Sequence, residues 1–288
     1  MQNEYSINDV SAVVCTLNSS TSIAQCLDAL VKSEIKDILV VDGGSTDSTI
    51  EIIKKFRVSL IFDDGKGLGA ARNLGIQNVT TALVLNCGAD NLMNSGVINS
   101  MLRALEIDSN LAGVSCRTKV LETTIFGKLT DLQWKGKISS GLKNIIGTPN
   151  IFKTSVLITN PYSISRKASD DEELCRRLFE LFEAKFLTVN DFCLEMGQAS
   201  WNRLIYRYNL YGKSDYEVWS ANAFNWNAQR KLYSIGHPFR SEVKSMFVNL
   251  GLFEFMVVLP LAILSCMIRY SAWIRNACRF KSFGIRRS

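Results

Sequence analysis

The chain is predicted to form an α/β domain built on a doubly wound, mostly parallel β-sheet. Through the first 110 residues, short and uniformly apolar runs alternate with segments whose apolar residues repeat at helical spacing. Strands that are apolar on both faces are typical of a parallel sheet covered by helices on each side, and their alternation with helices indicates βαβ units. A length of 288 residues suits one such domain with an appendage.

Four strands and four helices are expected to alternate in this part of the chain. The expected strands are Val10–Cys15, Ile38–Val41, Val58–Phe62 and Ala82–Leu85. Apolar residues at helical spacing predict helices around 23–31, 50–56, 68–77 and 97–105. In a doubly wound sheet, ligands bind beyond the carboxyl ends of the strands. The site is therefore expected in the loops 16–20, 42–47, 63–67 and 86–91.

The second half of the chain shows two clear features. Residues 111–160 follow neither period clearly, but Ser169–Phe186 is expected to be a helix that begins with a capping box and an acidic turn. Met246–Ile268 is apolar for most of its length, close to the roughly 20 residues that cross a bilayer core. We therefore expect a catalytic domain at 1–239 and a basic, apolar, membrane-associating tail at 240–288.

The net charge of +6 arises from this tail. Residues 1–239 carry 25 of the 33 basic and 25 of the 27 acidic residues, so the body is neutral. A basic tail beside an apolar run favours anionic lipid as its partner, and a neutral body argues against nucleic acid. The eight cysteines include no CxxC pair and are expected to be reduced thiols, and a single histidine excludes multi-histidine zinc sites.

Polar residues follow the first, second and fourth expected strands. Thr16 and Asn18 follow the first strand, Asp42 ends the second before two glycines, and Asp90 follows the fourth. A carboxylate at a strand end can accept a hydrogen bond from a ribose or base, and one beside a diphosphate can ligate Mg²⁺ or Mn²⁺. The alternative for these loops is an ordinary turn with a residue that caps the next helix.

The loop after the third strand fits a different kind of site. Gly65, Gly67 and Ala70 match the GxGxxA pattern of dinucleotide-binding enzymes. Asp63 and Asp64 would repel a pyrophosphate there, and the fingerprint normally opens the first βαβ unit rather than the third. An NAD(P)-dependent oxidoreductase that uses this loop is therefore the first alternative.

Four acidic residues crowd the first turn of the helix expected at 169–186, namely Asp170, Asp171, Glu172 and Glu173. Acidic residues at this position stabilise a helix through its dipole. Clustered carboxylates also repel one another, which can raise the pKa of one of them and leave a general base. Glu172 is expected to form the capping box with Ser169. On this pattern alone, the structural and the catalytic interpretations both remain open.

Three segments of the chain stand in the order and spacing of a known family. They are Val13–Asn18 (VVCTLN), Val41–Thr49 (VDGGSTDST) and Gly69–Ile76 (GAARNLGI). Together they resemble the family 2 glycosyltransferases, which have the GT-A fold. The resemblance covers about the first 110 residues well and 150–240 loosely. The combination of the VDGGSTD loop with the ARNxGI helix is specific, whereas neither segment alone would be.

The resemblance implies that a sugar is transferred from a nucleotide-diphospho-sugar donor. It implies that Thr16, Asn18 and Asp42 line the nucleotide pocket and that Arg72 lies near the donor. Asp90 would hold a divalent cation, Mg or Mn, at the diphosphate. Two departures concern this donor site. Gly43 stands where the family commonly has a second Asp that reads the base, and the family's DxD motif is reduced to Gly88-Ala89-Asp90.

The resemblance also implies a catalytic base and an acceptor site. Asp170 and Asp171 resemble the family's ED motif, with Asp171 as the base that deprotonates the acceptor hydroxyl while the anomeric configuration inverts. Downstream, Trp201 would stack on an acceptor sugar, and Arg203 or Arg207 would reach the diphosphate. A non-catalytic, sugar-binding relative of these enzymes is the second alternative.

The acceptor is expected to be a glycan or a lipid-linked sugar at the cytoplasmic face of a membrane, reached through residues 246–268. Nucleotide sugars are cytosolic, so the catalytic body is expected on that side. A single crossing would place most of the basic residues of the tail outside, against the positive-inside tendency. Glu254 is costly in mid-bilayer and Pro260 permits a kink, so an in-plane or re-entrant arrangement is expected.

Overall fold

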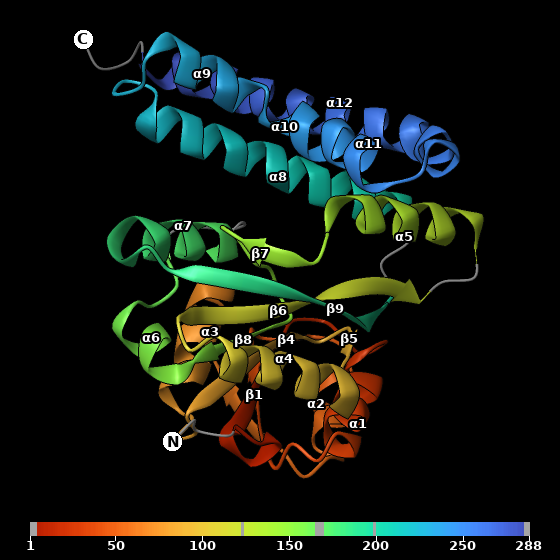
Figure 1. Ribbon diagram of the computed structural model, residues 1–288, viewed down its shortest axis with the longest axis vertical. Helices are drawn as coiled ribbons and strands as arrows, with labels where there is room; N and C mark the ends of the chain where they lie inside the picture. The colour runs from red at the N-terminus through yellow and green to blue at the C-terminus, as the bar shows by residue number, and fades with distance from the viewer. Residues whose placement is uncertain (1–4, 122–123, 165–169, 198–199, 285–288) are drawn as a thin grey trace. The chain divides into compact units, whose positions relative to one another are not determined.

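The computed structural model describes residues 5–121, 124–164, 170–197 and 200–284. The chain forms two compact units, of which the first combines Met1–Leu121 with Ser139–Gly197. The second combines Glu122–Ile138 with Gln198–Ser288. The elements of each are labelled in Figure 1. The boundary predicted at residue 239 falls inside the second unit. The assignment of catalysis to residues 1–239 stays a prediction.

Strands and helices alternate in the first 110 residues, as predicted. A short 3₁₀ helix (Ile7–Asp9) precedes the strands β1 (Val10–Thr16), β2 (Asp37–Asp42), β3 (Ser59–Phe62) and β4 (Leu83–Gly88). The helices are α1 (Ile23–Lys32), α2 (Thr49–Ile53), α3 (Leu68–Gln77) and α4 (Ser95–Ile107). Helix α4 begins two residues before its first predicted apolar position because the Asn94 side chain accepts a hydrogen bond from the Val97 N–H and caps it.

The remaining elements of the first unit complete the sheet and add two helices. They are β5 (Asn91–Leu92), β6 (Leu111–Leu121), β7 (Gly141–Lys143), β8 (Asn150–Lys153), α6 (Thr154–Thr159), α7 (Asp170–Phe182) and β9 (Lys185–Met196). The helix expected to reach Phe186 ends at Phe182, because Glu183 adopts a left-handed φ of 53° and the chain turns into β9. Phe186 is a buried strand residue. Ser169 lies outside the described residues, and its capping box with Glu172 stays a prediction.

The strands of the first unit form one sheet in the order β3-β2-β1-β4-β8-β6-β9-β5, with β7 paired to β9. Strands β3, β2, β1 and β4 run parallel to one another. Strand β8 enters antiparallel between β4 and β6, and β6 pairs with β9 in parallel. The prediction of a mostly parallel sheet is confirmed.

Both faces of the sheet are buried, which explains the uniformly apolar strands. Ala12 and Val40 lie in a core with residues of α1 and α4, whereas their neighbours Val13 and Val41 lie in a second core with α3 and α7. Alternate residues of a strand point to opposite faces, so a strand that is covered on both sides has no solvent-facing position for polar residues.

The second unit is helical. It contains α5 (Ile125–Lys137), α8 (Trp201–Asn222), α9 (Ala228–Ile235), α10 (His237–Phe239), a π-helical turn (Arg240–Lys244), α11 (Ser245–Asn249) and α12 (Leu252–Gly284). Figure 1 shows α12 alongside α8. The apolar run expected over 246–268 is divided between α11 and α12, and α12 continues through Pro260. Among the described residues, α12 is the one helix long and apolar enough to cross a membrane.

Apolar contacts and a buried ionic network hold these helices together. Apolar residues of α12 pack against Leu132 of α5 and against Leu204 and Tyr208 of α8. The buried ionic network consists of Lys137, Asp215, Glu242 and Arg269. It joins α5, α8, the π-helical turn and α12, so these four elements are tied together by charge as well as by apolar contact.

Candidate active site

The carboxyl ends of neighbouring parallel strands meet at one edge of the sheet. Thr16 lies opposite Asp42 on adjacent strands, and Cys15 lies opposite Gly88 on the other side of β1. The loops after β1, β2, β3 and β4 therefore border the same edge, where a doubly wound sheet binds its ligands.

Asn18 and Asp42 build the loop that follows β2. The buried Asp42 carboxylate accepts hydrogen bonds from the N–H groups of Gly44 (2.9 Å) and Ser45 (2.7 Å) and from the Ser45 hydroxyl (2.6 Å). Asn18 Oδ1 accepts from the Thr46 N–H at 2.8 Å, and its own N–H donates to Ser45 Oγ at 2.8 Å. Both residues thus shape the VDGGSTD loop, while direct contact with a nucleotide stays a prediction for each.

Two adjoining cavities open at this edge. The β3-side cavity, of about 220 Å³, is lined by Cys15, Thr16, Leu17, Gly43, Asp63, Gly65, Gly67, Leu68 and Ala71. The β4-side cavity, of about 210 Å³, is lined by Val13, Cys15, Leu68, Arg72, Asn86, Cys87, Gly88, Asp90, Asn91, Thr148 and Glu195. They share Cys15 and Leu68, so the two cavities are direct neighbours. Burial raises the pKa of the Cys15 thiol to about 12, so the shared wall carries no charge there.

The β3-side cavity contains a buried hydroxyl without a hydrogen bond. Among the described residues, none is a hydrogen-bond partner of Thr16 Oγ1. An unsatisfied buried hydroxyl costs free energy, which a polar ligand group can recover. Asp63 lies in the same wall, where its Oδ1 accepts from the Gly65 N–H at 2.8 Å. The predicted Thr16 therefore lines the cavity with its hydroxyl oxygen buried in the wall, and Asp63 joins it there.

Two glycines seat α3 tightly in the first unit. A Cβ on Gly75 would lie 2.4 Å from Cγ1 of Val13, and a Cβ on Gly69 would lie 2.5 Å from the carbonyl oxygen of Ser163. Neither position has room for a side chain, so α3 approaches β1 and the 161–164 segment closely. Arg72, between the two glycines, is thereby held in the wall of the β4-side cavity.

Arg72 binds two carboxylates at the start of α7. Its Nη1 lies 2.5 Å from Asp170 Oδ2 and 2.8 Å from Asp171 Oδ1. Its Nη2 donates to Thr148 Oγ1 at 2.6 Å, and the Thr148 hydroxyl donates to Asp171 Oδ2 at 3.1 Å. The structure therefore brings together the predicted residues Arg72, Asp170 and Asp171 and adds Thr148 to them.

Burial sets the electrostatics of this cluster. The Arg72 and Asp170 side chains are each 7% exposed, whereas Asp171 is 20% exposed. Burial raises the pKa of Asp171; Arg72 opposes the rise and Asp170 adds to it. Burial also opposes the charge on Arg72, but the two carboxylates outweigh it and keep the pKa of Arg72 above its ordinary value. The cluster thus pairs a permanent cation with a carboxylate suited to accept a proton.

Tyr162 and Asn73 fix the position of the Arg72 side chain. Asn73 Nδ2 donates to the Tyr162 carbonyl, and Asn73 Oδ1 accepts from the Tyr162 N–H, both at 2.8 Å. The Arg72 guanidinium then lies 4.9 Å from the centroid of the Tyr162 ring. The Asn of the ARN segment therefore positions the Arg beside it.

Asp90 lines the β4-side cavity together with Asn91 and Glu195. Asn91 Oδ1 accepts from the Gly88 N–H at 2.8 Å, which shapes the turn before Asp90. In the part of the chain that the structure describes, no three His, Cys, Asp or Glu side chains are grouped as a metal site made by protein alone. Mg²⁺ usually binds through one or two carboxylates together with substrate phosphates, and Asp90 with Glu195 fits that kind of site.

The three remaining predicted residues belong to α8 in the second unit. Trp201 is half exposed and contacts Phe126, with ring centroids 4.4 Å apart. The Arg207 guanidinium lies 5.0 Å from the centroid of the Trp134 ring, and Arg203 is exposed. Their roles toward acceptor and diphosphate stay predictions.

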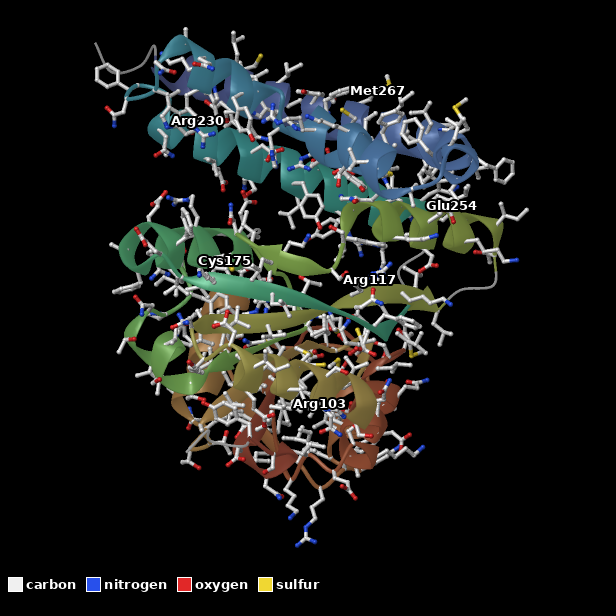
Figure 2. The ribbon with its side chains drawn as sticks, viewed as in Figure 1. Arg103, Arg117, Cys175, Arg230, Glu254 and Met267 are labelled. Carbon is white, nitrogen blue, oxygen red and sulfur yellow. The ribbon has the colours of Figure 1, made fainter. Side chains whose placement is uncertain are left out.

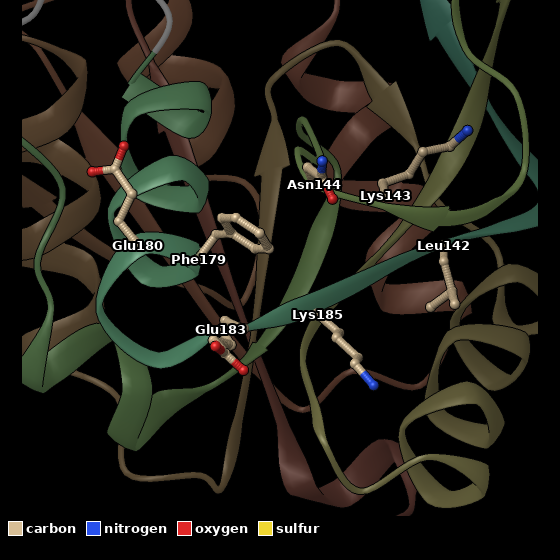
Figure 3. A pocket seen from close by; sticks show the side chains of 8 residues that line it. Leu142, Lys143, Asn144, Phe179, Glu180, Glu183 and Lys185 are labelled. Atoms are coloured by element: carbon tan, nitrogen blue, oxygen red, sulfur yellow. The ribbon is translucent and has the colours of Figure 1, made fainter.

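A larger cavity of about 570 Å³ lies elsewhere in the first unit. Figure 3 shows its lining, in which Phe179 and Glu180 come from α7 and Lys143 and Lys185 come from β7 and β9. Leu142, Asn144, Glu183 and Ala184 complete the wall. Its charged side chains carry both signs, and none of its lining residues comes from the loops after β1, β2, β3 and β4, so its volume alone does not make it the site of catalysis.

The sequence patterns gave no role to several residues of the two cavities. Asp63 and Asn86 fall within the segments 63–67 and 86–91 that the topology rule selects, but the pattern there marks Asp63 only as a residue that would repel a pyrophosphate and gives Asn86 no role. Thr148 and Glu195 come from regions whose pattern assigned no element. Their contacts depend on the pairing of distant segments, and no local signal marks them.

The chain belongs to the glycosyl transferase family 2, whose family model matches residues 11–172. This match confirms the family that the VDGGSTD and ARNxGI segments predicted. The matched range contains both strand-end cavities except Glu195, and it ends directly after Asp170 and Asp171. The match favours the glycosyltransferase prediction over an NAD(P)-dependent oxidoreductase.

Two curated relatives are similar to part of the chain. Glycosyltransferase GlyA from Streptococcus pneumoniae is 28% identical over 103 residues, which cover 33% of this chain and 15% of that protein. A poly-beta-1,6-N-acetyl-D-glucosamine synthase from Staphylococcus aureus is 23% identical over 173 residues, which cover 54% of this chain and 42% of that protein. The chain therefore spans less than half the length of either relative.

Two solved structures share the fold at low sequence identity. Mannosyltransferase PcManGT from Pyrobaculum calidifontis, in complex with GDP-Man and Mn²⁺, superposes with a TM-score of 0.63 at 16% identity, covering 93% of this chain and 87% of that one. S. aureus TarS 1-349 in complex with UDP-GlcNAc superposes with a TM-score of 0.54 at 14% identity, covering 93% and 88%. The predicted GT-A-like fold is thereby confirmed.

Proposed function

We propose that the protein transfers a sugar from a nucleotide-diphospho-sugar donor to a hydroxyl group of an acceptor, with inversion at the anomeric carbon. The observation that carries this proposal is the cluster of Arg72, Asp170, Asp171 and Thr148 beside the strand-end cavities. A leaving diphosphate needs a cation and an attacking hydroxyl needs a base, and this cluster holds both.

The donor occupies the two adjoining cavities in this proposal. The nucleoside lies in the β3-side cavity, whose wall includes Thr16 and Asp63. The diphosphate and sugar lie in the β4-side cavity, whose wall includes the Arg72 guanidinium, paired with Asp170 and Asp171. Asn18 and Asp42 support the nucleoside by shaping the loop after β2.

Asp171 removes the proton from the acceptor hydroxyl as its oxygen attacks the anomeric carbon. The bond between that carbon and the diphosphate oxygen breaks, and the diphosphate leaves with both electrons. A single attack from the face opposite the leaving group inverts the configuration. Asp171 is the better base of the pair because Asp170 is less exposed and lies closer to Arg72, at 2.5 Å against 2.8 Å.

A divalent cation fits the same site. Asp90, with Glu195 beside it, would hold Mg²⁺ or Mn²⁺ together with the donor phosphates. When bound, the cation would add positive charge at the leaving diphosphate. The PcManGT structure with GDP-Man and Mn²⁺ supports this assignment.

The acceptor is proposed to be a glycan or a lipid-linked sugar at the cytoplasmic face of a membrane. A relative named as a polysaccharide synthase supports a glycan acceptor. The apolar helix α12 and the basic tail support attachment to anionic lipid through residues 246–268. In this proposal, Trp201 contacts the acceptor, and Arg203 or Arg207 reaches the diphosphate.

A panel of nucleotides tests the proposal. Sugars linked to UDP and to GDP should raise the melting temperature of the purified protein, and one of them should be hydrolysed slowly without acceptor. Protection by NAD(P) alone would overturn the proposal in favour of the oxidoreductase. Protection by a nucleotide sugar without hydrolysis, and without transfer to any glycan offered, would favour the non-catalytic relative.

A further inference from the structure

The outward face of α12 is apolar. Leu252, Phe253, Met256, Val257, Ile263, Met267 and Ile274 are exposed large apolar side chains, and we call them the α12 stripe. The successive steps between them are one, three, one, six, four and seven residues, which at 100° per residue keeps all seven within an arc of about 140° on one side of the helix. Figure 2 shows Met267 on the side of α12 away from α8. An exposed apolar surface of this length marks an interaction site rather than a water-facing surface.

The inward face of α12 is already satisfied by the rest of the second unit. Apolar residues of this face pack against α5 and α8. The buried Arg269 donates to Asp215 through Nε at 2.5 Å and through Nη2 at 2.8 Å, and Ser265 accepts from Gln133 at 3.0 Å. A surface helix in water presents polar and charged residues on its outward face. The outward face of α12 carries the apolar stripe instead, which indicates that the stripe faces an apolar phase.

The packing of α12 on α8 excludes a simple crossing. A Cβ on Gly212 of α8 would lie 2.1 Å from the Arg269 carbonyl oxygen, so the two helices are in backbone contact. Helix α8 carries Arg203, Arg207, Lys213, Asp215 and Glu217, and a charge at the centre of a bilayer is costly. A crossing α12 would either take these charges into the bilayer or break the buried ionic network.

The positive charge of residues 240–288 indicates what kind of surface the α12 stripe meets. The basic excess of the whole chain lies in residues 240–288, which also contain the stripe. Lys244 and Arg275 are exposed near the two ends of the stripe. An apolar stripe with flanking basic residues is typical of a helix that lies in the interface of an anionic membrane.

We propose that the second unit lies on an anionic bilayer with α12 parallel to the membrane plane and the α12 stripe in the lipid. The inference rests on the proposed membrane attachment and adds the face and the orientation of the helix. This arrangement differs from that of a single-span protein, in which the same apolar residues would cross the bilayer.

Binding to vesicles tests the stripe. The full chain should bind phosphatidylcholine vesicles that contain phosphatidylglycerol more tightly than vesicles of phosphatidylcholine alone. The variant Met256→Gln/Ile263→Gln/Met267→Gln keeps good helix formers. It should lower the partition coefficient about 10²–10³-fold, the size expected when three apolar side chains that are each about half exposed no longer enter the lipid. The matched control is Ile107→Gln/Ile158→Gln/Leu181→Gln, which changes exposed apolar residues of the first unit and should bind as the parent does.

The outcomes separate this inference from the proposals on which it rests. Melting temperature and nucleotide-sugar hydrolysis, measured without vesicles, show whether each variant is folded. If the parent protein does not bind vesicles, membrane attachment itself fails. Equal binding by the parent and the stripe variant would mean that the protein attaches to the membrane through another surface, and it would overturn the proposal that the α12 stripe enters the lipid. A stripe variant that changes only the oligomeric state would show that the stripe meets protein instead of lipid.

Depth measurements test the orientation. Single cysteines at Phe253, Ile263 and Ile274 can carry a fluorophore in a Cys278→Ser background, because seven of the eight native thiols are buried or half-buried. Quenching by lipids brominated at different depths should place the three labels at one depth. Labels spread over about 30 Å, the rise of the intervening helix, would show a crossing helix and overturn the proposal.

Discussion

The two carboxylate oxygens of Asp171 make different contacts. Oδ1 accepts from Arg72 Nη1 at 2.8 Å, whereas Oδ2 accepts from the Thr148 hydroxyl at 3.1 Å and from Arg72 Nη2 at 3.5 Å. Burial raises the pKa of this carboxyl group, and the neighbouring Asp170 adds to the rise. A base of this kind can take a proton from a hydroxyl in a site where most ordinary aspartates are too acidic.

The pH dependence of transfer should therefore report Asp171. Only the carboxylate form accepts a proton, so kcat/KM should fall as the pH drops through the pKa of Asp171. Because burial raises that pKa, the acid limb should lie above the ordinary aspartate value of about 3.9. A profile that stays flat down to about pH 4 would show that a different group, or none, limits the rate.

Thr148 is expected to position Asp171. Thr148→Val removes a hydrogen bond that favours the charged carboxylate, so the pKa of Asp171 should rise and the acid limb should move to higher pH. Loss of one such bond to a charged group should cost about tenfold in turnover. Thr148→Ser keeps the hydroxyl and should restore the profile. An unshifted acid limb in Thr148→Val would reduce Thr148 to a packing role.

Asp90 is expected to bind the donor together with a metal. Asp90→Ala should weaken nucleotide-sugar binding about tenfold in the presence of Mn²⁺, with little change in melting temperature. Asp64→Ala is the matched control, because Asp64 is an exposed acid of the neighbouring loop and lines neither cavity. Calorimetric titration with and without Mn²⁺ measures both. If Asp90→Ala binds the nucleotide sugar as tightly as the parent does, both with and without Mn²⁺, Asp90 does not bind the donor or its metal.

Two ion-paired residues hold helix α12: Glu254 in its first turn pairs with Lys135 of α5 at 2.5 Å, and the buried Arg269 lies further along the helix. Arg269 bridges Asp215 of α8 and Glu242 of the π-helical turn, and Lys137 of α5 also binds Glu242, at 2.8 Å. Burial opposes ionisation of Glu242, but Lys137 and Arg269 outweigh it and hold the pKa of Glu242 below its usual value. The network therefore stabilises the second unit while its carboxylates are charged.

Arg269→Met should destabilise the second unit by about 2–3 kcal/mol, less than for a fully buried pair because Asp215 is partly exposed. Arg275→Met, at an exposed position of the same helix, is the matched control. Because the pKa of Glu242 is lowered on folding, its share of the stability is complete above about pH 5 and is lost on acidification. The difference in melting temperature between parent and Arg269→Met should therefore shrink in acid; a constant difference would contradict the ionic role.

Elements with local patterns were predictable from the sequence, and elements fixed by distant contacts were not. Helix α3 spans Leu68–Gln77 as its apolar spacing predicts. The end of α7 was placed too late because the apolar residues of β9 follow after a two-residue turn and continue the pattern. Thr148 carries no local signal, since its partner Arg72 lies 76 residues away along the chain.

At the scale of the whole molecule, the chain leaves the first unit and returns to it. Helix α5 lies between β6 and β7 in sequence, yet it groups with α8 and α12 in the second unit. A boundary drawn along the sequence cannot show this, because grouping depends on which helices bury one another's apolar faces. The donor loops were predictable, since parallel strands bring their carboxyl ends to one edge.

The central claim is that Asp171 is the general base of a glycosyltransferase, and its direct test is turnover by Asp171→Asn. Glu172→Gln is the matched control, because it removes a charge from the same helical turn. Both variants lose about the same favourable interaction with the helix dipole, roughly 0.3–1 kcal/mol. We predict that Asp171→Asn binds the nucleotide sugar normally and loses about 10²–10⁴ in turnover, while Glu172→Gln keeps near-normal turnover. Near-normal turnover in Asp171→Asn, with only the small loss of stability, would contradict the account and leave the acidic turn a structural feature of α7.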